Sequence, residues 1–287
     1  MAGVTLPVPQ PCRVSQSVTV HQKYACRNAR PVLAILWLFL VALLASAPVP
    51  ARADQSAFTN FLQQGETAGR QGDIPGAIKF FKSADQAEPD NSADLCIVTR
   101  HYCDLMYATT VPDLQKQLAG AALDCAQRAV QADPKNPTAH LCVGVAYAKN
   151  FPYVDNRTEV KWSRAIKTEA ETAIALDPKQ DLGYYLLGRW NYDTANLNFL
   201  LKGLVKLIYG GLPQSSNEEA IRNFKKAIAL APNRILHRLA LARAYETTGQ
   251  PKLALIELKK CRTLKPVDLD DAAAQKAAAA LLAKIGP

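Results

Sequence analysis

The chain has 287 residues, of which 49% are hydrophobic, so it can build a buried core and is not an intrinsically disordered protein. Its formal net charge is +9, from 34 Lys and Arg against 25 Asp and Glu. Residues 1–53 hold five of the basic residues and no acidic residue, so the rest of the chain carries only +4, from 29 basic against 25 acidic residues. A charge this small does not favour nucleic acid as a partner, and we expect none.

Residues 1–53 are predicted to be a targeting segment, either a signal peptide or an N-terminal anchor. Residues 32–45 form an apolar run of 14 residues, which is short for a membrane-spanning helix and typical of a signal-peptide core. The Ala-Arg-Ala of residues 51–53 matches a cleavage pattern that would leave Asp54 as the new N-terminus. We expect an exported protein, periplasmic or extracellular after cleavage at Ala53. The alternative is a chain anchored in a membrane by residues 32–51.

From residue 57 onward the sequence repeats one helical pattern of small and apolar residues that ends at a proline. In the first unit the pattern is Ala77, Phe81, Ala84 and Pro89. Because an α-helix turns about every 3.6 residues, the first three lie on one face, and small side chains there let a neighbouring helix approach closely. The spacing recurs, in full or in part, at Ala122, Ala126, Ala129 and Pro134, at Ala170, Ala173 and Pro178, at Ala220, Phe224, Ala227 and Pro232, and at Ala254, Leu258, Cys261 and Pro266.

A second kind of helix follows each of the first four prolines and carries its own marks. Ten and thirteen residues after the proline stand, in order, Thr99 and Tyr102, Gly144 and Tyr147, Gly188 and Asn191, and Ala242 and Tyr245. The alternation predicts a repeat domain over residues 54–268, with units at about 57–91, 92–136, 137–180, 181–234 and 235–268. The alanine-rich residues 269–287 suit a C-terminal capping helix, with Asp270 and Asp271 at its start and Gly286 near its end.

These marks resemble the tetratricopeptide repeat, whose pattern of W-x2-L-G-x2-Y, then A-x3-F and P, describes two antiparallel helices per unit. Leu187-Gly188 with Tyr192 sits on the first half of that pattern, and Ala220, Phe224 and Pro232 sit on the second half. One unit cannot bury its apolar face alone, and stacked units form a continuous core. We therefore expect an all-α solenoid of about five helical hairpins with a C-terminal capping helix.

The units are longer than the family period of about 34 residues. The terminal prolines are 45, 44, 54 and 34 residues apart, and the extra residues fall between the two helices of the second, third and fourth units. The longest insertion, residues 197–211, combines apolar residues such as Phe199 with Lys202 and Lys206. It predicts either an extra helix packed over the repeats or a lid or membrane-facing helix with a lysine edge, with Phe199, Lys202 and Lys206 as candidate lipid contacts.

A closer resemblance is carried by Leu187-Gly188-Arg189-Trp190 with Tyr192, followed by the long insertion, residues 212–216 and Phe224. Together with Thr138-Ala139-His140 after Asp133-Pro134, this stretch is similar to the regulator of microtubule dynamics family. The resemblance implies a helical repeat domain without enzymatic activity, often attached to a membrane by an N-terminal segment, that acts through protein or lipid contacts.

Eleven residues after the first four prolines stand Arg100, Val145, Arg189 and Arg243, in the helices that line the concave groove of such repeats. Arginine binds carboxylate and phosphate through paired hydrogen bonds, so three arginines in equivalent places predict a basic track. Tyr185 and Tyr192 would stand near Arg189 on the same helix. We predict that these five residues, Arg100, Tyr185, Arg189, Tyr192 and Arg243, bind a protein or peptide partner. The alternative is a solvated groove with salt bridges to Glu66 or Asp193.

The five cysteines after residue 53 offer one candidate disulfide, between Cys96 and Cys142 near the starts of consecutive groove-lining helices. His101 and Cys103 with Cys96 do not have the spacing of a metal site, and we expect no metal and no cofactor. The sequence also offers no G-x-S-x-G, no H-E-x-x-H and no phosphate-binding glycine loop. We expect a binding or scaffolding module rather than an enzyme, with a lipid-binding or membrane-tethering protein as the alternative.

Overall fold

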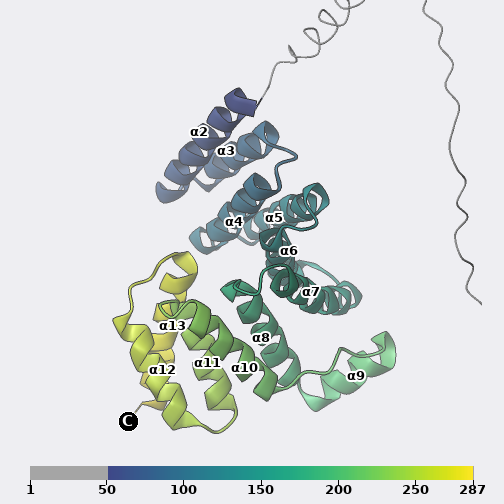
Figure 1. Cartoon of the computed structure of the whole chain (residues 1–287), viewed down its shortest axis with the longest axis vertical. Helices are drawn as coiled ribbons and strands as arrows, with labels where there is room; N and C mark the ends of the chain where they lie inside the picture. The colour runs from purple at the N-terminus through teal and green to yellow at the C-terminus, as the bar shows by residue number, and fades with distance from the viewer. Residues whose placement is uncertain (1–50, 287) are drawn as a thin grey trace, which may run out of the picture. The chain divides into compact units, whose positions relative to one another are not determined.

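The computed structural model describes residues 51–286, and every regular element in that range is a helix (Figure 1). The predicted signal peptide or anchor lies outside the described residues, apart from residues 51–53, which begin the first helix. Within the described range no helix is both long enough and apolar enough to cross a membrane.

The described helices form antiparallel pairs that follow one another along the chain (Figure 1). The first helices of the pairs are α2 (Ala51–Arg70), α4 (Ser92–Ala108), α6 (Pro137–Asn150), α8 (Asp181–Ala195) and α11 (Ile235–Thr247). The second helices are α3 (Ile74–Ala87), α5 (Pro112–Ala132), α7 (Asn156–Leu176), α10 (Asn217–Leu230) and α12 (Pro251–Thr263). The last helix, α13 (Leu269–Ile285), packs against α11 and α12. The fold is therefore the predicted all-α solenoid of about five hairpins with a C-terminal capping helix.

The small residues of the repeat pattern are contact points for large side chains. A Cβ atom added to Gly188 would lie 2.7 Å from the ring of Phe224, and one added to Gly144 would lie 2.6 Å from Leu186 of the next unit. Gly65 has the same relation to Phe81 in the first unit. Close packing of helices leaves no room for even a methyl group at these three glycines.

Several helix starts are capped by side chains. Asn91 and Asn136 accept hydrogen bonds from the first amides of α4 and α6, and Asp155 does the same for α7. Ser216 caps α10 by accepting from the amide of Glu219 at 3.1 Å. These caps satisfy amides that the helix itself leaves unpaired.

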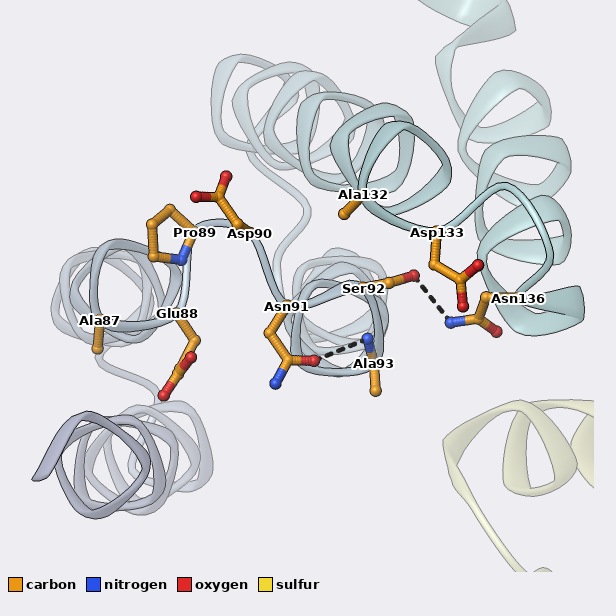
Figure 2. A pocket seen from close by; sticks show the side chains of 10 residues that line it. All are labelled: Ala87, Glu88, Pro89, Asp90, Asn91, Ser92, Ala93, Ala132, Asp133 and Asn136. Atoms are coloured by element: carbon orange, nitrogen blue, oxygen red, sulfur yellow. Dashed lines mark hydrogen bonds between the residues drawn. The ribbon is translucent and has the colours of Figure 1, made fainter. Parts of the chain in front are cut away.

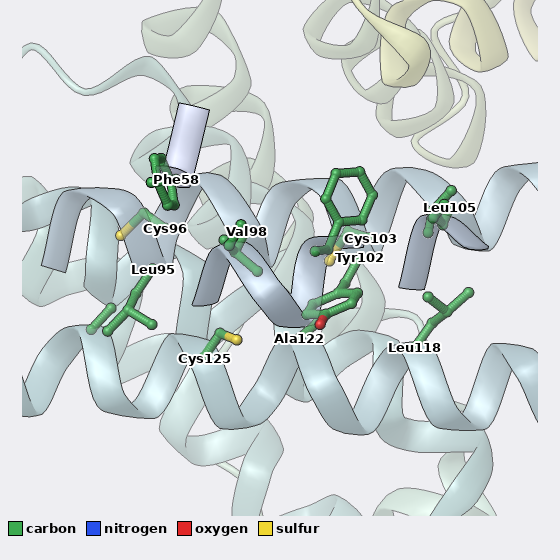
Figure 3. Close-up of a cluster of buried hydrophobic side chains, with 14 of the residues drawn as sticks. Phe58, Leu95, Cys96, Val98, Tyr102, Cys103, Leu105, Leu118, Ala122 and Cys125 are labelled. Atoms are coloured by element: carbon green, nitrogen blue, oxygen red, sulfur yellow. The ribbon is translucent and has the colours of Figure 1, made fainter. Parts of the chain in front are cut away.

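The core runs between the helices as a series of apolar clusters. Figure 3 shows the cluster of the first two pairs, in which Phe58, Leu95, Val98 and Leu118 are almost fully buried. A second cluster joins α10, α11, α12 and α13 and includes Phe224. Each hairpin thus buries its apolar face against its neighbours, as repeat proteins must.

The inserted residues lengthen helices in two units and form a separate helix in a third. The second helices α5 and α7 have 21 residues each, against 14 in α3 and α10, and a short 3-10 turn (Phe151–Tyr153) precedes α7. In the fourth unit the insertion forms α9 (Phe199–Tyr209) between α8 and α10.

Helix α9 is held at both ends but is not packed over the repeats (Figure 1). It starts at Asn198, whose side chain accepts from the amide of Leu201 at 2.7 Å, and ends at Gly210 in the left-handed conformation. The guanidinium of Arg164 on α7 donates to the carbonyl oxygen of Gly211 at 3.1 Å. Among the residues of α9 only Val205 is buried, so the interpretation of the insertion as a helix covering the stack is wrong.

Candidate partner-binding face

The candidate face is formed by the outward sides of α4, α6, α8 and α11, which we call the first-helix face. Consecutive first helices contact one another along the chain. The four repeat-equivalent positions hold Arg100, Val145, Arg189 and Arg243. Arg100, Val145 and Arg189 are exposed and Arg243 is half-buried. The face therefore offers three guanidinium groups on three different helices.

The three predicted arginines differ in their ion pairs. Arg189 contacts Asp193 of its own helix at 2.7 Å, and Arg100 contacts Asp268, just before α13, at 3.7 Å. Arg243 has no carboxylate within ion-pair distance among the described residues. Glu66 lies 3.6 Å from Arg70 and from His101 instead. The alternative of a groove with salt bridges thus describes Arg189, while Arg243 remains available to a partner.

The two predicted tyrosines join the fourth and fifth units. The ring of Tyr185 lies 6.1 Å from the Phe224 ring and 5.3 Å from the His237 ring, between centroids. Burial raises the pKa of the Tyr185 phenol, and Arg189 acts in the opposite direction. The Tyr192 hydroxyl and the Thr247 hydroxyl are hydrogen-bonded at 2.9 Å, which links α8 to α11. The two tyrosines therefore fix α8 against α10 and α11 beside Arg189.

An acidic turn that sequence reasoning did not assign to the face lies at its edge. Asp268 caps α13 by accepting from the Asp271 amide at 2.9 Å, and it also pairs with Arg234 at 2.8 Å. Asp271 is fully buried and accepts from the Leu236 amide at 2.9 Å. Of the three aspartates in this turn, Asp270 points to a different helix, because its carboxylate accepts from the hydroxyl of Tyr107 at 2.7 Å.

Tyr107 on α4 connects this turn to α6 and was also missed from the sequence. Lys149 of α6 donates to the Tyr107 hydroxyl at 3.2 Å, and its ammonium lies 4.4 Å from the centre of the Tyr107 ring. Nearby, burial raises the pKa of Asp104 to about 6, with a further contribution from Asp270 and opposition from Arg100. No repeat mark falls on Tyr107 or Lys149, so only the three-dimensional arrangement reveals them.

The cysteines Cys96 and Cys142 lie next to each other as free thiols. The Cys142 thiol contacts the carbonyl oxygen of Cys96 at 3.9 Å. A hydrogen bond from the Cys142 thiol lowers the pKa of Cys96, and the same contact together with burial raises that of Cys142. The disulfide between them therefore stays a prediction, and the two side chains lie close to each other.

One cluster of possible metal ligands lies outside the first-helix face, at Asp85, Asp124 and Cys125. The guanidinium of Arg128 already binds it, at 2.5 Å from Asp85, 3.0 Å from Asp124 and 3.5 Å from the Cys125 sulfur. A cation is thus supplied by the chain itself, and we assign no metal to this cluster.

A shallow hollow lies between the turns that join the first three hairpins (Figure 2). The amide of Asn136 donates to the Ser92 hydroxyl at 2.9 Å, and that hydroxyl donates to the Ala129 carbonyl at 2.7 Å. Because these polar groups are paired with each other, the hollow is a junction between hairpins, and we assign it no ligand.

The candidate lipid contacts on α9 have different surroundings. Phe199 is 91% exposed and Leu207 is 84% exposed. Lys202 is exposed, but its ammonium donates to the carbonyl oxygen of Ala195 at 2.6 Å, at the end of α8. Lys206 is exposed in the last turn of the helix. The outer side of α9 is therefore apolar, with its two lysines set to one edge.

The chain is similar to curated proteins that are named regulator of microtubule dynamics protein 1, 2 or 3. The human regulator of microtubule dynamics protein 2 is 28% identical over 180 residues, which cover 62% of this chain and 43% of the relative. The mouse regulator of microtubule dynamics protein 1 is 29% identical over 174 residues, covering 60% and 57%. The chain thus spans about half the length of the curated relatives it matches.

The chain is also similar to a solved structure and to a family model. One solved structure is that of a thermophilic tetratricopeptide repeat protein from Thermus thermophilus, which is 20% identical to this chain with a TM-score of 0.54. The alignment covers 78% of this chain and 99% of the Thermus chain. This similarity shows the fold alone. The family model described as regulator of microtubule dynamics protein 1-3 matches residues 58–286. Since this match covers most of the chain, the chain belongs to the regulator of microtubule dynamics protein 1-3 family.

Proposed function

We propose that this chain is a non-enzymatic binding or scaffolding module that recognises a protein or peptide partner through the first-helix face. The observation that carries the proposal is the set of three arginines at repeat-equivalent positions, two exposed and one half-buried, on α4, α8 and α11. Three guanidinium groups on separate rigid helices can bind carboxylates of one extended partner at several points. Tyr185 and Tyr192 support this arrangement by fixing α8 against its neighbours.

The arginines would contribute unequally to binding. Arg243 needs no exchange of ion pairs before it binds a partner carboxylate, whereas Arg189 is shared with Asp193 and Arg100 with Asp268. The pair with Asp193 also orients the Arg189 side chain along the helix surface. We therefore place the main anchor of a partner at Arg243 on α11, the helix that Tyr192 contacts through Thr247.

The curated relatives are named for microtubule dynamics, and their names concern those proteins. The proposal for this chain covers its binding character and names neither tubulin nor any other relative's partner. For an exported protein, as the sequence predicts, partners would be sought among exported and envelope proteins.

The test is a pull-down from the native cell with the triple variant Arg100→Glu, Arg189→Glu and Arg243→Glu. The matched control reverses three exposed lysines on second helices, Lys82, Lys252 and Lys259. We expect partner recovery to fall at least about tenfold, which corresponds to about 1.4 kcal/mol, in the first variant only. Equal recovery with the two variants would overturn the proposal.

A second candidate function is contact with a lipid surface through α9. It is supported by the exposed apolar side chains on the outer side of this helix, together with Lys202 and Lys206, which could interact with anionic headgroups. The test is flotation of residues 54–287 with vesicles of neutral and anionic phospholipid, compared with a variant carrying Phe199→Ser, Leu200→Ser and Leu207→Ser. Equal flotation of the two proteins would exclude this function.

A further inference from the structure

We propose that the acidic turn of residues 268–271 is a built-in, displaceable occupant of the first-helix face, and that the partner displacing it carries an acidic segment of the same chemistry. The inference rests on the proposed function, because it names the partner class for the part of that face formed by α4 and α6. It concerns Arg100 and Tyr107, which contact the turn, and Lys149, which donates to the Tyr107 hydroxyl.

The contact joins parts of the fold that are not neighbours in the stack. Tyr107 and Asp270 are 163 residues apart, and α4 belongs to the second hairpin while the turn begins the capping helix. The bridge between Arg100 and Asp268 repeats the same connection about two turns of α4 earlier. Two independent side-chain contacts therefore connect the cap to the second hairpin across the first-helix face.

The contact between the turn and α4 can open at little cost in free energy, because no buried apolar residues in the described part of the chain surround it. Arg100 is 63% exposed at its side chain and Tyr107 is 50% exposed. Val267 and Leu269, the apolar residues of the turn, are exposed as well. Exposed ion pairs and hydrogen bonds compete with water and are therefore weak. Neighbouring hairpins, in contrast, meet through fully buried residues.

When the contact opens, the turn stays with the cap and the donors stay with α4 and α6. Asp268 is held by Arg234 at 2.8 Å and Asp271 by the Leu236 amide at 2.9 Å, both from the start of α11 and the residue before it. Separation would therefore take place between the turn and α4. It would leave the Arg100 guanidinium and the Tyr107 hydroxyl without their carboxylate partners, beside the Lys149 ammonium on the adjacent helix α6.

The chemistry of these groups defines the partner. Arg100 and Tyr107 contact two aspartate carboxylates of the turn, Asp268 and Asp270, which are separated by one residue. Lys149 donates to the Tyr107 hydroxyl and adds a positive charge beside it. An external segment with acidic residues at the same spacing would meet the same donors. Asp104, whose pKa Asp270 and Asp268 raise by repulsion, would repel an external acidic segment in the same way as it repels the turn.

The test uses a fluorescent peptide that copies residues 264–274, LKPVDLDDAAA, and a control peptide in which its three aspartates are asparagines. Asp270→Asn removes the negative charge from the group that accepts from the Tyr107 hydroxyl and leaves all three donors on α4 and α6 intact. We expect the full-length Asp270→Asn protein to bind the acidic peptide at least about tenfold more tightly than the wild type, and the asparagine peptide not to gain. Equal binding of the acidic peptide by the two proteins would overturn the inference.

A second measurement does not depend on any partner. Spin labels at Gln127 on α5 and Lys276 on α13, both exposed, report the distance between the second hairpin and the cap. We expect a longer or broader distance distribution in Asp270→Asn and in Tyr107→Phe than in the wild type, and identical distributions would overturn the inference. A loss of partner recovery in the triple arginine variant, with unchanged peptide binding and distances, would leave the proposed function standing and remove only this inference.

Discussion

Two kinds of junction hold the described helices together. Neighbouring hairpins meet through buried apolar residues, as where Leu186 of α8 fills the space beside Gly144 of α6. The start of α13 meets α4 through exposed polar groups, such as Tyr107 and Asp270. Apolar burial contributes about 25 cal/mol per Å², while an exposed ion pair contributes about 0–1 kcal/mol. The first kind of junction therefore carries the fold, and the second can change without unfolding it.

Helices α9 and α13 lie outside the repeat pattern, and they differ in how far their apolar side chains are buried. The apolar α9 exposes Phe199 and Leu207, whereas the alanine-rich α13 buries Ala274 and Ala278 against its neighbours. Apolar content alone thus does not decide burial. A helix is buried when its neighbours offer a complementary surface, and small alanine side chains fit the close surface of α11 and α12.

The largest expected effect comes from breaking a buried junction. Phe224→Ala empties the space between α10 and Gly188, and we expect it to cost about 3–5 kcal/mol of unfolding free energy. Urea unfolding followed by circular dichroism measures this loss. The matched control is Phe199→Ala, which we expect to stay within about 0.5 kcal/mol of the wild type. Similar losses in the two variants would contradict the comparison.

The acidic turn offers the comparison within adjacent residues. Asp271 is fully buried and accepts from the amide of Leu236, so Asp271→Ala leaves that donor unpaired and should cost about 2–4 kcal/mol. Asp270 makes an exposed contact with Tyr107, and Asp270→Ala should cost less than about 1 kcal/mol. Thermal unfolding of the two variants checks the order, and a larger loss for Asp270→Ala would reverse our assignment of the two junctions.

The thiols of Cys96 and Cys142 lie at a junction between two hairpins, and Cys96 differs from the other cysteines in the direction of its pKa shift. Burial raises the pKa of Cys103, Cys125 and Cys261 to about 12, whereas the thiol of Cys142 lowers that of Cys96. We expect mild oxidation to join Cys96 to Cys142 and to stabilise the protein by about 2–4 kcal/mol. Peptide mapping by mass spectrometry identifies the bond, with Cys96→Ser as the control. A mixed set of disulfides that includes Cys261 would show that proximity does not select the pair.

The buried junctions could be predicted from the sequence because they repeat. Ala77, Phe81 and Ala84, which share a helix face by their spacing, are all buried at 1% exposure or less. Spacing within one helix decides which side chains share a face, and the recurrence of that spacing shows that the faces meet. The fold class follows from these local rules.

The contact with the acidic turn could not be predicted in the same way. Asp270 and Asp271 suited an ordinary helix start, and nothing local distinguishes the aspartate that is buried from the one that reaches Tyr107. That contact depends on how successive hairpins are rotated relative to one another. The repeat spacing was enough to predict that Arg100 lies on the first-helix face. Its partner Asp268 lies in a segment that follows no repeat spacing, so the contact between them could not be predicted.

The smallest expected effect concerns Asp104, beside the exposed junction. Its pKa is raised from 3.8 to about 6, first by burial and then by Asp270, so the folded protein favours the neutral carboxyl. This contribution to stability is fully present below pH 3.8 and is lost as the pH rises through about 6. Asp104→Asn should therefore be more stable than the wild type by about 1 kcal/mol at about pH 8, allowing for solvent screening, and equal to it at about pH 3.5.

Urea unfolding of the wild type and Asp104→Asn across this pH range checks both the sign and the window of the effect. If Asp270 contributes as its position indicates, the advantage of Asp104→Asn should shrink when Asp270 is also replaced by asparagine. An advantage that stays constant from about pH 3.5 to about pH 8 would show that packing, and not ionisation of Asp104, is responsible. A smaller stability gain from Asp104→Asn in the Asp270→Asn background would show that repulsion between Asp104 and Asp270 weakens the exposed junction. The buried junctions, which apolar residues form, carry no such repulsion and stay closed.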